Sequence, residues 1–225
     1  MATTKTAAKK RSTKSKDFKN ELVQKYKEYV LTHGHEPTSI FLFTKELGME
    51  ENKFYEYFGS FNAIKTAIWT SMLNETISAV KSDGVFEEYT SREKMLAFYY
   101  TFIERLKEDR SYVQFSIDHR FERREFMPSY IKAFREHFVE FVQDIINEGV
   151  QNEEIAKRPI ISDRYKDAQW LQLIFIVNFW LKDDSAGFSK TDAAIEKSVN
   201  LAFELMAGGP LDMMIDFAKF MYQSR

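Results

Sequence analysis

The sequence predicts an all-α protein, and three observations carry this prediction. All the long apolar patterns repeat at the helical period, and no segment alternates as a strand does. Only 8 Gly and 4 Pro interrupt the 225 residues. The prolines fall where helices are expected to begin or end, at Pro37, Pro128, Pro159 and Pro210. We therefore expect ten helices and no sheet.

The chain begins with a basic arm, residues 1–16. It contains six basic residues and no acidic one, so its net charge is +6. The arm is rich in Ala, Thr, Ser and Lys and lacks apolar periodicity, which predicts disorder in isolation. A DNA-seeking role and a merely solubilising role both fit this composition. The first helix is then expected from about Asp17 to Thr32, and it should stop at Gly34.

The next two helices are short and lie within residues 38–58. Apolar residues recur at helical spacing before and after Gly48: Ile40, Phe43 and Leu47, then Phe54, Tyr55 and Phe58. A glycine at the turn accepts a backbone angle that other residues resist, so the second helix can cross the first steeply. This is the pattern of a helix-turn-helix unit, whose second helix enters the major groove of DNA.

Longer helices follow this unit. They are expected at about 60–81, 91–108, 111–121, 128–149, 163–181, 190–207 and 211–222. We expect a DNA-binding domain over residues 17–65, and a second helical domain over residues 66–225.

The N-terminal pattern resembles the TetR family of bacterial transcriptional regulators. The resemblance is carried by Gly34, Thr38-Ser39-Ile40, Phe43-Thr44, Leu47-Gly48, and Tyr55-x-Tyr57-Phe58 followed by Ser60. A weaker echo is Ile145-Ile146-x-x-Gly149 with Asn152-x-Glu154-Ile155, which resembles the end of a long helix in TetR-like ligand domains. The resemblance implies an N-terminal three-helix DNA-binding domain and a C-terminal ligand-binding and dimerisation domain. It also implies a ligand-responsive repressor that acts as a homodimer on a palindromic operator.

Six residues are candidates for contacts with double-stranded DNA. The resemblance implies phosphate contacts for Thr38 and Tyr57, and Tyr55 can also reach the backbone with its hydroxyl. Lys53 can meet a base edge or a phosphate, and Asn52 can pair with adenine. Lys65 can replace a lysine that the family commonly has where this chain has Phe61.

Acidic residues open a second interpretation. Residues 17–65 contain six Lys and eight acidic residues, and Glu50-Glu51 open the expected recognition helix. Carboxylates suit a helix N-terminus but repel phosphate. The alternative is therefore a TetR-fold protein that binds a lipid or another small molecule and has lost operator binding, as in certain proteins of coenzyme Q biosynthesis.

Aromatic residues make up 16% of the chain, and most of them follow residue 85. They can line a cavity for an apolar small-molecule effector, or they can simply form the core. The candidate ligand-binding residues are Tyr99, Phe102, His119, Phe134, Phe138, Trp170, Phe175 and Asn178.

The segment Trp170–Lys182 is apolar almost all round a helix, which predicts either a central helix or a subunit interface. The resemblance implies a homodimer through the helices near 163–181 and 190–207. A central core helix in a monomer is the alternative.

Composition and motifs disfavour several other classes. The absence of Cys excludes disulfides and zinc-finger sites, and no apolar run reaches the roughly 18 residues of a membrane span. The start of the chain lacks the apolar segment of a secretory signal, so we expect a cytoplasmic protein with no membrane contact. Phosphate-loop, nucleophile-elbow and metalloprotease motifs are all missing. We therefore expect neither an enzyme nor a cofactor or metal site.

Overall fold

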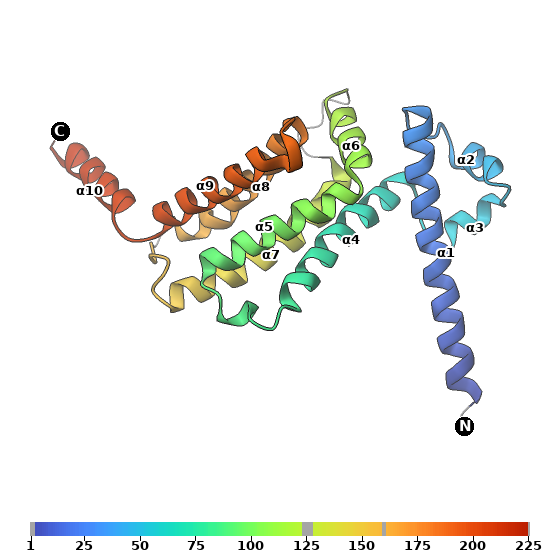
Figure 1. Ribbon diagram of the computed structural model, residues 1–225, viewed down its shortest axis with the longest axis horizontal. Coiled ribbons are helices and arrows are strands. Elements are labelled where there is room, and N and C mark those ends of the chain that lie inside the picture. The colour runs from blue at the N-terminus through green and yellow to red at the C-terminus, as the bar shows by residue number, and fades with distance from the viewer. Residues whose placement is uncertain (1–2, 123–127, 159–160, 225) are drawn as a thin grey trace. The chain divides into compact units, whose positions relative to one another are not determined.

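The computed structural model describes residues 3–122, 128–158 and 161–224, and these residues form helices and no strand. The predicted all-α fold is confirmed. The chain divides into two compact units (Figure 1). Unit 1 comprises Met1–Ser71 and Asp109–Lys132, and unit 2 comprises Met72–Glu108 and Ala133–Arg225. The helix α4 (Phe61–Lys81) contributes residues to both.

Unit 1 is built around one buried aromatic residue, Phe43. Besides part of α4, the unit contains α1 (Thr3–His33), α2 (Ile40–Glu46), α3 (Glu51–Tyr55) and α6 (Arg110–Glu122). The Phe43 ring lies 6.3 Å from Tyr26 on α1, 6.4 Å from Phe54 on α3 and 5.6 Å from Phe61 on α4. These edge-on contacts join four helices into one core.

The turn between α2 and α3 has the geometry that the sequence predicts. Ser39 caps α2, since its Oγ accepts a hydrogen bond from the Leu42 amide at 3.2 Å. After α2, Gly48 adopts a φ of +66°, a left-handed conformation in which a side chain would be strained. The chain therefore reverses sharply before α3 begins at Glu51.

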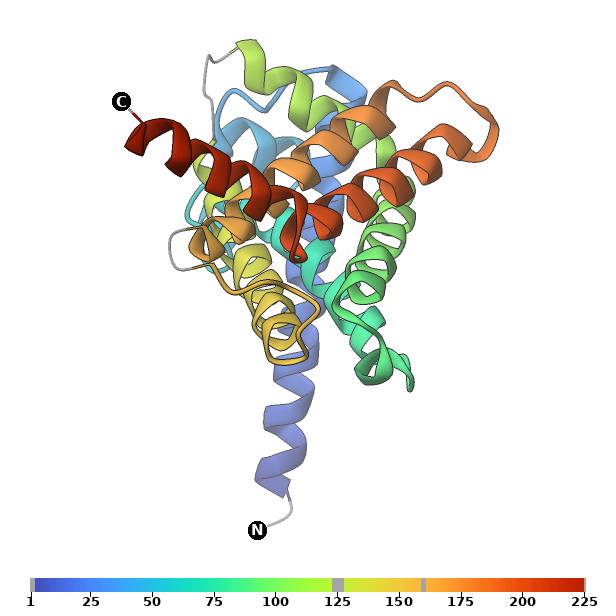
Figure 2. The ribbon, with the colours of Figure 1, turned by 90° about the vertical axis from the view of Figure 1, so that its left-hand side faces the viewer.

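The helix α1 is longer than predicted. It begins at Thr3 and not near Asp17, so the expected disordered arm is helical in this structure. Ala, Lys and Arg favour helices, and no Gly or Pro precedes Gly34, so nothing in the local sequence stops the helix. Figures 1 and 2 show the N-terminal part of α1 running on beyond α2 and α3.

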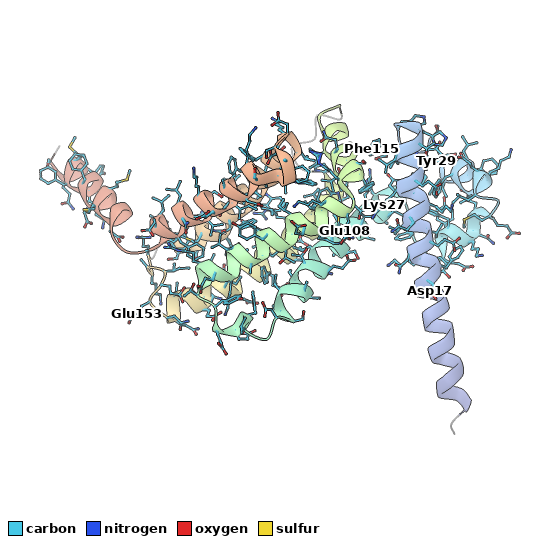
Figure 3. All side chains as sticks on the ribbon, viewed as in Figure 1. Asp17, Lys27, Tyr29, Glu108, Phe115 and Glu153 are labelled. Carbon is cyan, nitrogen blue, oxygen red and sulfur yellow. The ribbon has the colours of Figure 1, made fainter. Side chains whose placement is uncertain are left out.

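The helix α6 belongs to unit 1, which the sequence did not predict. Lys27 on α1 donates from Nζ to Asp109 Oδ2 at 2.8 Å, and Trp69 Nε1 on α4 donates to Ser116 Oγ at 3.0 Å. Lys27 and Tyr29 point to different sides of α1, and Tyr29 contacts Phe43 (Figure 3). Unit 1 is therefore discontinuous in sequence, unlike the single segment expected up to residue 65.

Unit 2 is a helical bundle. Besides the rest of α4, it contains α5 (Ser91–Glu108), most of α7 (Ser129–Gln151), α8 (Tyr165–Lys182), α9 (Ser189–Met206) and α10 (Pro210–Gln223). Short 3-10 turns lie at Phe86–Glu88, Ser162–Arg164 and Ala186–Phe188. The helices α5, α8 and α9 pack against one another.

Two features fix α5 against α7 in unit 2. The buried Lys94 Nζ lies 2.6 Å from both carboxylate oxygens of Glu148. Gly149 lies so close to α5 that an added Cβ would be 2.6 Å from Ser91 Oγ and 2.7 Å from Ile155 Cδ1. Only a residue without a side chain allows this approach.

The turn before α9 is less exposed than expected for two adjacent aspartates. Asp184 is exposed, but Asp183 is buried and accepts hydrogen bonds from Ser185 and Thr191. Desolvation alone would raise the pKa of Asp183, but these hydrogen bonds hold it well below its usual range. Asp183 thereby organises the start of α9.

Candidate DNA interface and sensor core

The helix α3 presents polar side chains on one side and a hydrophobic anchor on the other. Phe54 is fully buried beneath it, whereas Asn52, Lys53 and Tyr55 are exposed. The Lys53 ammonium lies 4.3 Å from the centroid of the Phe18 ring on α1. This cation–π contact keeps the lysine on the surface while leaving its charge in solvent.

Among the residues that precede α2, Thr38 lies outside the helix. The helix cap is Ser39, and Thr38 lies one residue before it with its side chain exposed. Thr38 is therefore available to a phosphate beside the N-terminus of α2, but it does not cap that helix.

The two tyrosines after Phe54 have different surroundings. Tyr55 is 51% exposed, and its hydroxyl donates to Glu51 Oε1 at 3.2 Å. Tyr57 is partly buried, with its ring 5.1 Å from that of Phe18. The Tyr57 ring and the Lys53 ammonium both contact Phe18, so they tie the end of α3 to α1.

Lys65 does not have the surroundings that a DNA contact requires. It is 4% exposed, its Nζ lies 2.7 Å from Glu36 Oε1, and it lies 4.8 Å from the Tyr130 ring centroid. The sequence suggested that Lys65 replaces a phosphate-binding lysine, and the structure contradicts this. Its position on α4 turns the side chain into the core of unit 1, where the ion pair neutralises it.

The acidic residues at the start of α3 remain on the surface. Glu50 has an extended backbone and makes no side-chain hydrogen bond to cap the helix, and it is exposed. The candidate interface of α3 therefore carries Glu50 and Glu51 beside Asn52 and Lys53. The carboxylates, which repel phosphate, and the lysine, which attracts it, therefore lie within about one helical turn of each other.

Comparison with known proteins bears on the second half of the chain. A family model described as the tetracycline repressor-like C-terminal domain matches residues 94–221, which is more than half of the sequence. The chain belongs to the tetracycline repressor-like (TetR) family. No curated protein matches it significantly. Members of this family are regulators and not enzymes.

The aromatic candidates of this TetR-family regulator mostly form one cluster in unit 2. Phe102 contacts Phe134, and Trp170 lies 6.0 Å from both Phe134 and Phe138. Tyr99 is fully buried and donates its hydroxyl to the Gln169 carbonyl oxygen at 3.3 Å. The cluster joins α5, α7 and α8, so the structure brings five of the predicted ligand-binding residues together.

Three ligand candidates lie elsewhere. Phe175 is 48% exposed and contacts Phe179 on its own helix, so it is not part of this cluster. Asn178 donates to the Ile174 carbonyl oxygen at 2.7 Å, which satisfies its amide within α8. The side chain of His119 lies outside the described residues. Nearly all positions of Trp170–Lys182 are apolar, so their spacing does not show which aromatic residues face the core and which face solvent.

The helices α8 and α9 carry large apolar side chains on their solvent-facing sides. Leu171 is 63% exposed and Leu201 is 61% exposed, and Phe175 and Leu205 are also exposed. Exposed apolar residues on adjacent helices are typical of an interface between subunits. No helix among the described residues is both long and apolar enough to cross a membrane.

Two polar residues make long-range contacts that the sequence did not predict, although Asp109 was expected as a cap of the helix at 111–121. Arg158 is 6% exposed and joins the end of α9 to the start of α10. Asp109 pairs with Lys27 across 82 positions of the chain. No periodic pattern marks either residue, and an isolated charge in a loop usually lies in solvent.

Proposed function

We propose that this TetR-family regulator is a ligand-responsive repressor that binds a palindromic operator as a homodimer. The observation that carries the proposal is α3, a short helix anchored by buried Phe54 with Asn52 and Lys53 exposed. Its position after Gly48 fits a recognition helix in the major groove.

The phosphate contacts would come from several elements of unit 1. Thr38, Tyr55 and Tyr57 offer hydroxyl groups near the ends of α2 and α3. The basic arm supplies six positive charges, so the net charge is −2 for residues 17–65 but +4 for residues 1–65. Since phosphate neutralisation provides most of the non-specific affinity, the arm offsets the acidic residues of the helix-turn-helix unit.

The ligand is an apolar small molecule in this proposal. Aromatic residues from α5, α7 and α8 form the core of unit 2, and Tyr99 and Gln169 are the polar groups within it. Binding there would shift α4, which contributes to both units, and would change the spacing of the two recognition helices. A difference of about 1–3 kcal/mol in DNA affinity between the free and bound states suffices for a switch.

Selection of genomic fragments tests the DNA-binding claim. The purified full-length protein is mixed with sheared DNA of the source genome at low salt, and retained fragments are sequenced. We expect enrichment of fragments that share an inverted repeat with half-sites one helical turn apart. Failure to enrich any sequence at low salt would contradict operator binding.

The second candidate is a TetR-fold protein that binds a lipid or small molecule without an operator. The observation that favours it is the exposed Glu50, followed by Glu51, at the front of α3. Replacement of both by Gln distinguishes the two functions. A repressor would keep its sequence preference and gain affinity, whereas a protein that has lost its operator would gain only non-specific binding.

A further inference from the structure

The last helix, α10, has a sharply amphipathic surface. Met213, Phe217, Phe220 and Ser224 recur at spacings of four and three, which places them along one stripe, and Met214 and Met221 flank it. A polar stripe one residue behind contains Asp212, Asp216, Lys219 and Gln223. The apolar side chains are all far from buried, with Met213 at 68%, Phe217 at 65% and Phe220 at 63% exposure.

Arg158 fixes the direction in which α10 leaves the bundle. Its guanidinium donates from Nε to Asp212 Oδ1 at 2.6 Å and from Nη2 to Asp212 Oδ2 at 2.9 Å. The same group donates to the Ala207 carbonyl oxygen at 2.7 Å and to the Tyr165 hydroxyl at 2.5 Å. Asp212 also accepts from the Gly209 amide at 3.0 Å.

These contacts hold the polar stripe toward the bundle at the first turn of α10. In Figure 1, α10 continues past the ends of α8 and α9. A flexible tail would need no such bidentate anchor. The junction therefore presents the apolar stripe in a defined orientation.

We propose that the apolar stripe of α10 packs against a second copy of this chain and extends the α8–α9 dimer surface. This inference rests on the proposed homodimer, but it assigns α10 a separate part in it. Each partner would gain an arm, held by its own Arg158, that reaches across the two-fold axis.

The size of the surface supports a protein partner. Six large side chains of α10, Met213, Met214, Phe217, Phe220, Met221 and Tyr222, are each at least 52% exposed. At 150–250 Å² for an aromatic side chain, the three aromatic residues among them expose on the order of 400 Å², and the three methionines add to this area. A stable complex buries about 800 Å² on each partner.

Continuity favours a second copy over an unrelated protein. Leu205, 42% exposed in the last turn of α9, lies just before the α10 junction, and Leu201 lies one turn earlier. Exposed apolar side chains therefore lie on both sides of the junction, at the end of α9 and along α10. In a two-fold dimer the same surface faces itself, so one continuous patch serves both partners.

The charge of α10 disfavours a lipid surface as the occupant. Helices that lie on anionic membranes carry Lys and Arg along their polar side. Here that side has Asp212 and Asp216 against Lys219 alone, and Gln223 adds no charge. Because Arg158 pairs with Asp212 and Lys219 lies beside Asp216, this side has no excess of positive charge with which to attract an anionic bilayer.

Sedimentation equilibrium of the full-length chain tests the proposal. The variant Phe217→Ser/Phe220→Ser changes the apolar stripe, and the matched control Lys219→Ser/Gln223→Ser changes the polar stripe of the same helix. We expect the first variant to raise the dimer dissociation constant at least about tenfold, and the control to leave it within about twofold. Equal dissociation constants for both variants and the wild type would overturn the proposal.

Three outcomes distinguish failure of the proposed homodimer from failure of the α10 pairing alone. A wild-type chain that stays monomeric at about 100 µM removes the proposed homodimer and α10 pairing together. Dissociation by Leu171→Ser/Leu201→Ser with no effect of the α10 variant removes the α10 pairing alone. Co-sedimentation of the wild type with phosphatidylcholine or phosphatidylglycerol vesicles, lost in Phe217→Ser/Phe220→Ser, would also overturn the proposal and assign the stripe to a bilayer.

Because the chain has no Cys, a single introduced cysteine can report whether the apolar stripe of α10 is buried. This measurement does not require substitutions that disrupt the stripe. In the single-cysteine variant Met221→Cys, maleimide labelling is expected to slow at least about tenfold between dilute and concentrated protein, because dimerisation covers the thiol. Gln223→Cys on the polar stripe should label at one rate throughout. Labelling of Met221→Cys that does not depend on protein concentration would contradict the buried position.

Discussion

At the residue scale, two lysines of the DNA-binding unit show what sequence alone can and cannot assign. Lys53 and Lys65 are both basic residues of the family-like segment, and the pattern predicted DNA contacts for both. The structure leaves Lys53 exposed and buries Lys65 beside Glu36. The helical period places Phe54 inward and so Lys53 outward, but the acid that neutralises Lys65 lies 29 positions away.

The two lysines should therefore respond differently to substitution. Lys53→Ala is expected to weaken operator binding and to lower the slope of log affinity against log salt by about one for each lost contact. Thermal stability should stay nearly unchanged because the side chain is exposed. Fluorescence anisotropy over a salt series gives the slope, and a slope equal to that of the wild type would count against placing α3 in the groove.

Lys65→Ala should show the reverse behaviour. Removal of the ammonium takes away a buried ion pair with Glu36 and the cation–π contact with Tyr130, so we expect a loss of about 1–3 kcal/mol in the free energy of unfolding. Urea denaturation measures this loss. A variant as stable as the wild type would show that the ion pair contributes little.

Gly149 is a residue whose role the sequence resemblance marked without explaining it. Gly149→Ala is expected to destabilise the protein by about 1–3 kcal/mol, since the new Cβ would lie 2.6 Å from Ser91 Oγ. Gly59→Ala is the matched control, because a Cβ there meets nothing within 4 Å. Equal melting temperatures for the two variants would contradict the close packing of α5 and α7.

At the element scale, periodicity located the helices well and their neighbours poorly. The helices predicted at 163–181 and 190–207 correspond to Tyr165–Lys182 and Ser189–Met206. Apolar spacing reports which face of a helix is buried, but not which helix covers it. For this reason α6 was predicted correctly as a helix, while its place against α1 and α4 was not.

The junction between α9 and α10 should be sensitive to acid. The hydrogen bonds from Arg158 lower the pKa of Asp212 to about 2. Because the folded pKa lies below the unfolded value near 4, this carboxylate stabilises the junction above about pH 4, and the stabilisation is lost as the pH falls through about 2. Hydrogen exchange followed by mass spectrometry should show earlier deprotection of α10 than of α5 on acidification.

The variant Asp212→Asn gives the same test at neutral pH. It cannot form the charge-assisted pair with Arg158, so α10 should exchange faster than in the wild type. Asp216→Asn, on the same polar stripe but exposed, is the control. An α10 that stays equally protected in both variants would show that the pair does not hold the junction.

At the scale of the whole molecule, the distribution of charge matters more than its sum. The chain has a net charge of −2, yet its first sixteen residues are strongly basic. The charge asymmetry could be read directly from sequence, and it fits both an arm that seeks phosphate and one that only keeps the protein in solution. The helical state of that arm could not, because its composition is compatible with both disorder and helix.

Deletion of residues 2–16 tests the arm at this scale. We expect weaker binding to all DNA sequences and a flatter salt dependence, with the sequence preference retained. A competition assay between an operator fragment and random duplex measures both quantities. An unchanged salt slope would assign the arm to solubility alone.

The return of the chain to unit 1 through Asp109, Tyr112 and Ser116 matters for engineering. A biosensor built by grafting residues 1–65 onto a foreign sensor domain would lose both the aspartate that neutralises Lys27 and the tyrosine ring that packs against it. The grafted DNA-binding segment should then be insoluble or unable to bind its operator. A graft that folds would have to include residues 109–132 as well, so both segments of unit 1 would have to be joined to the foreign domain.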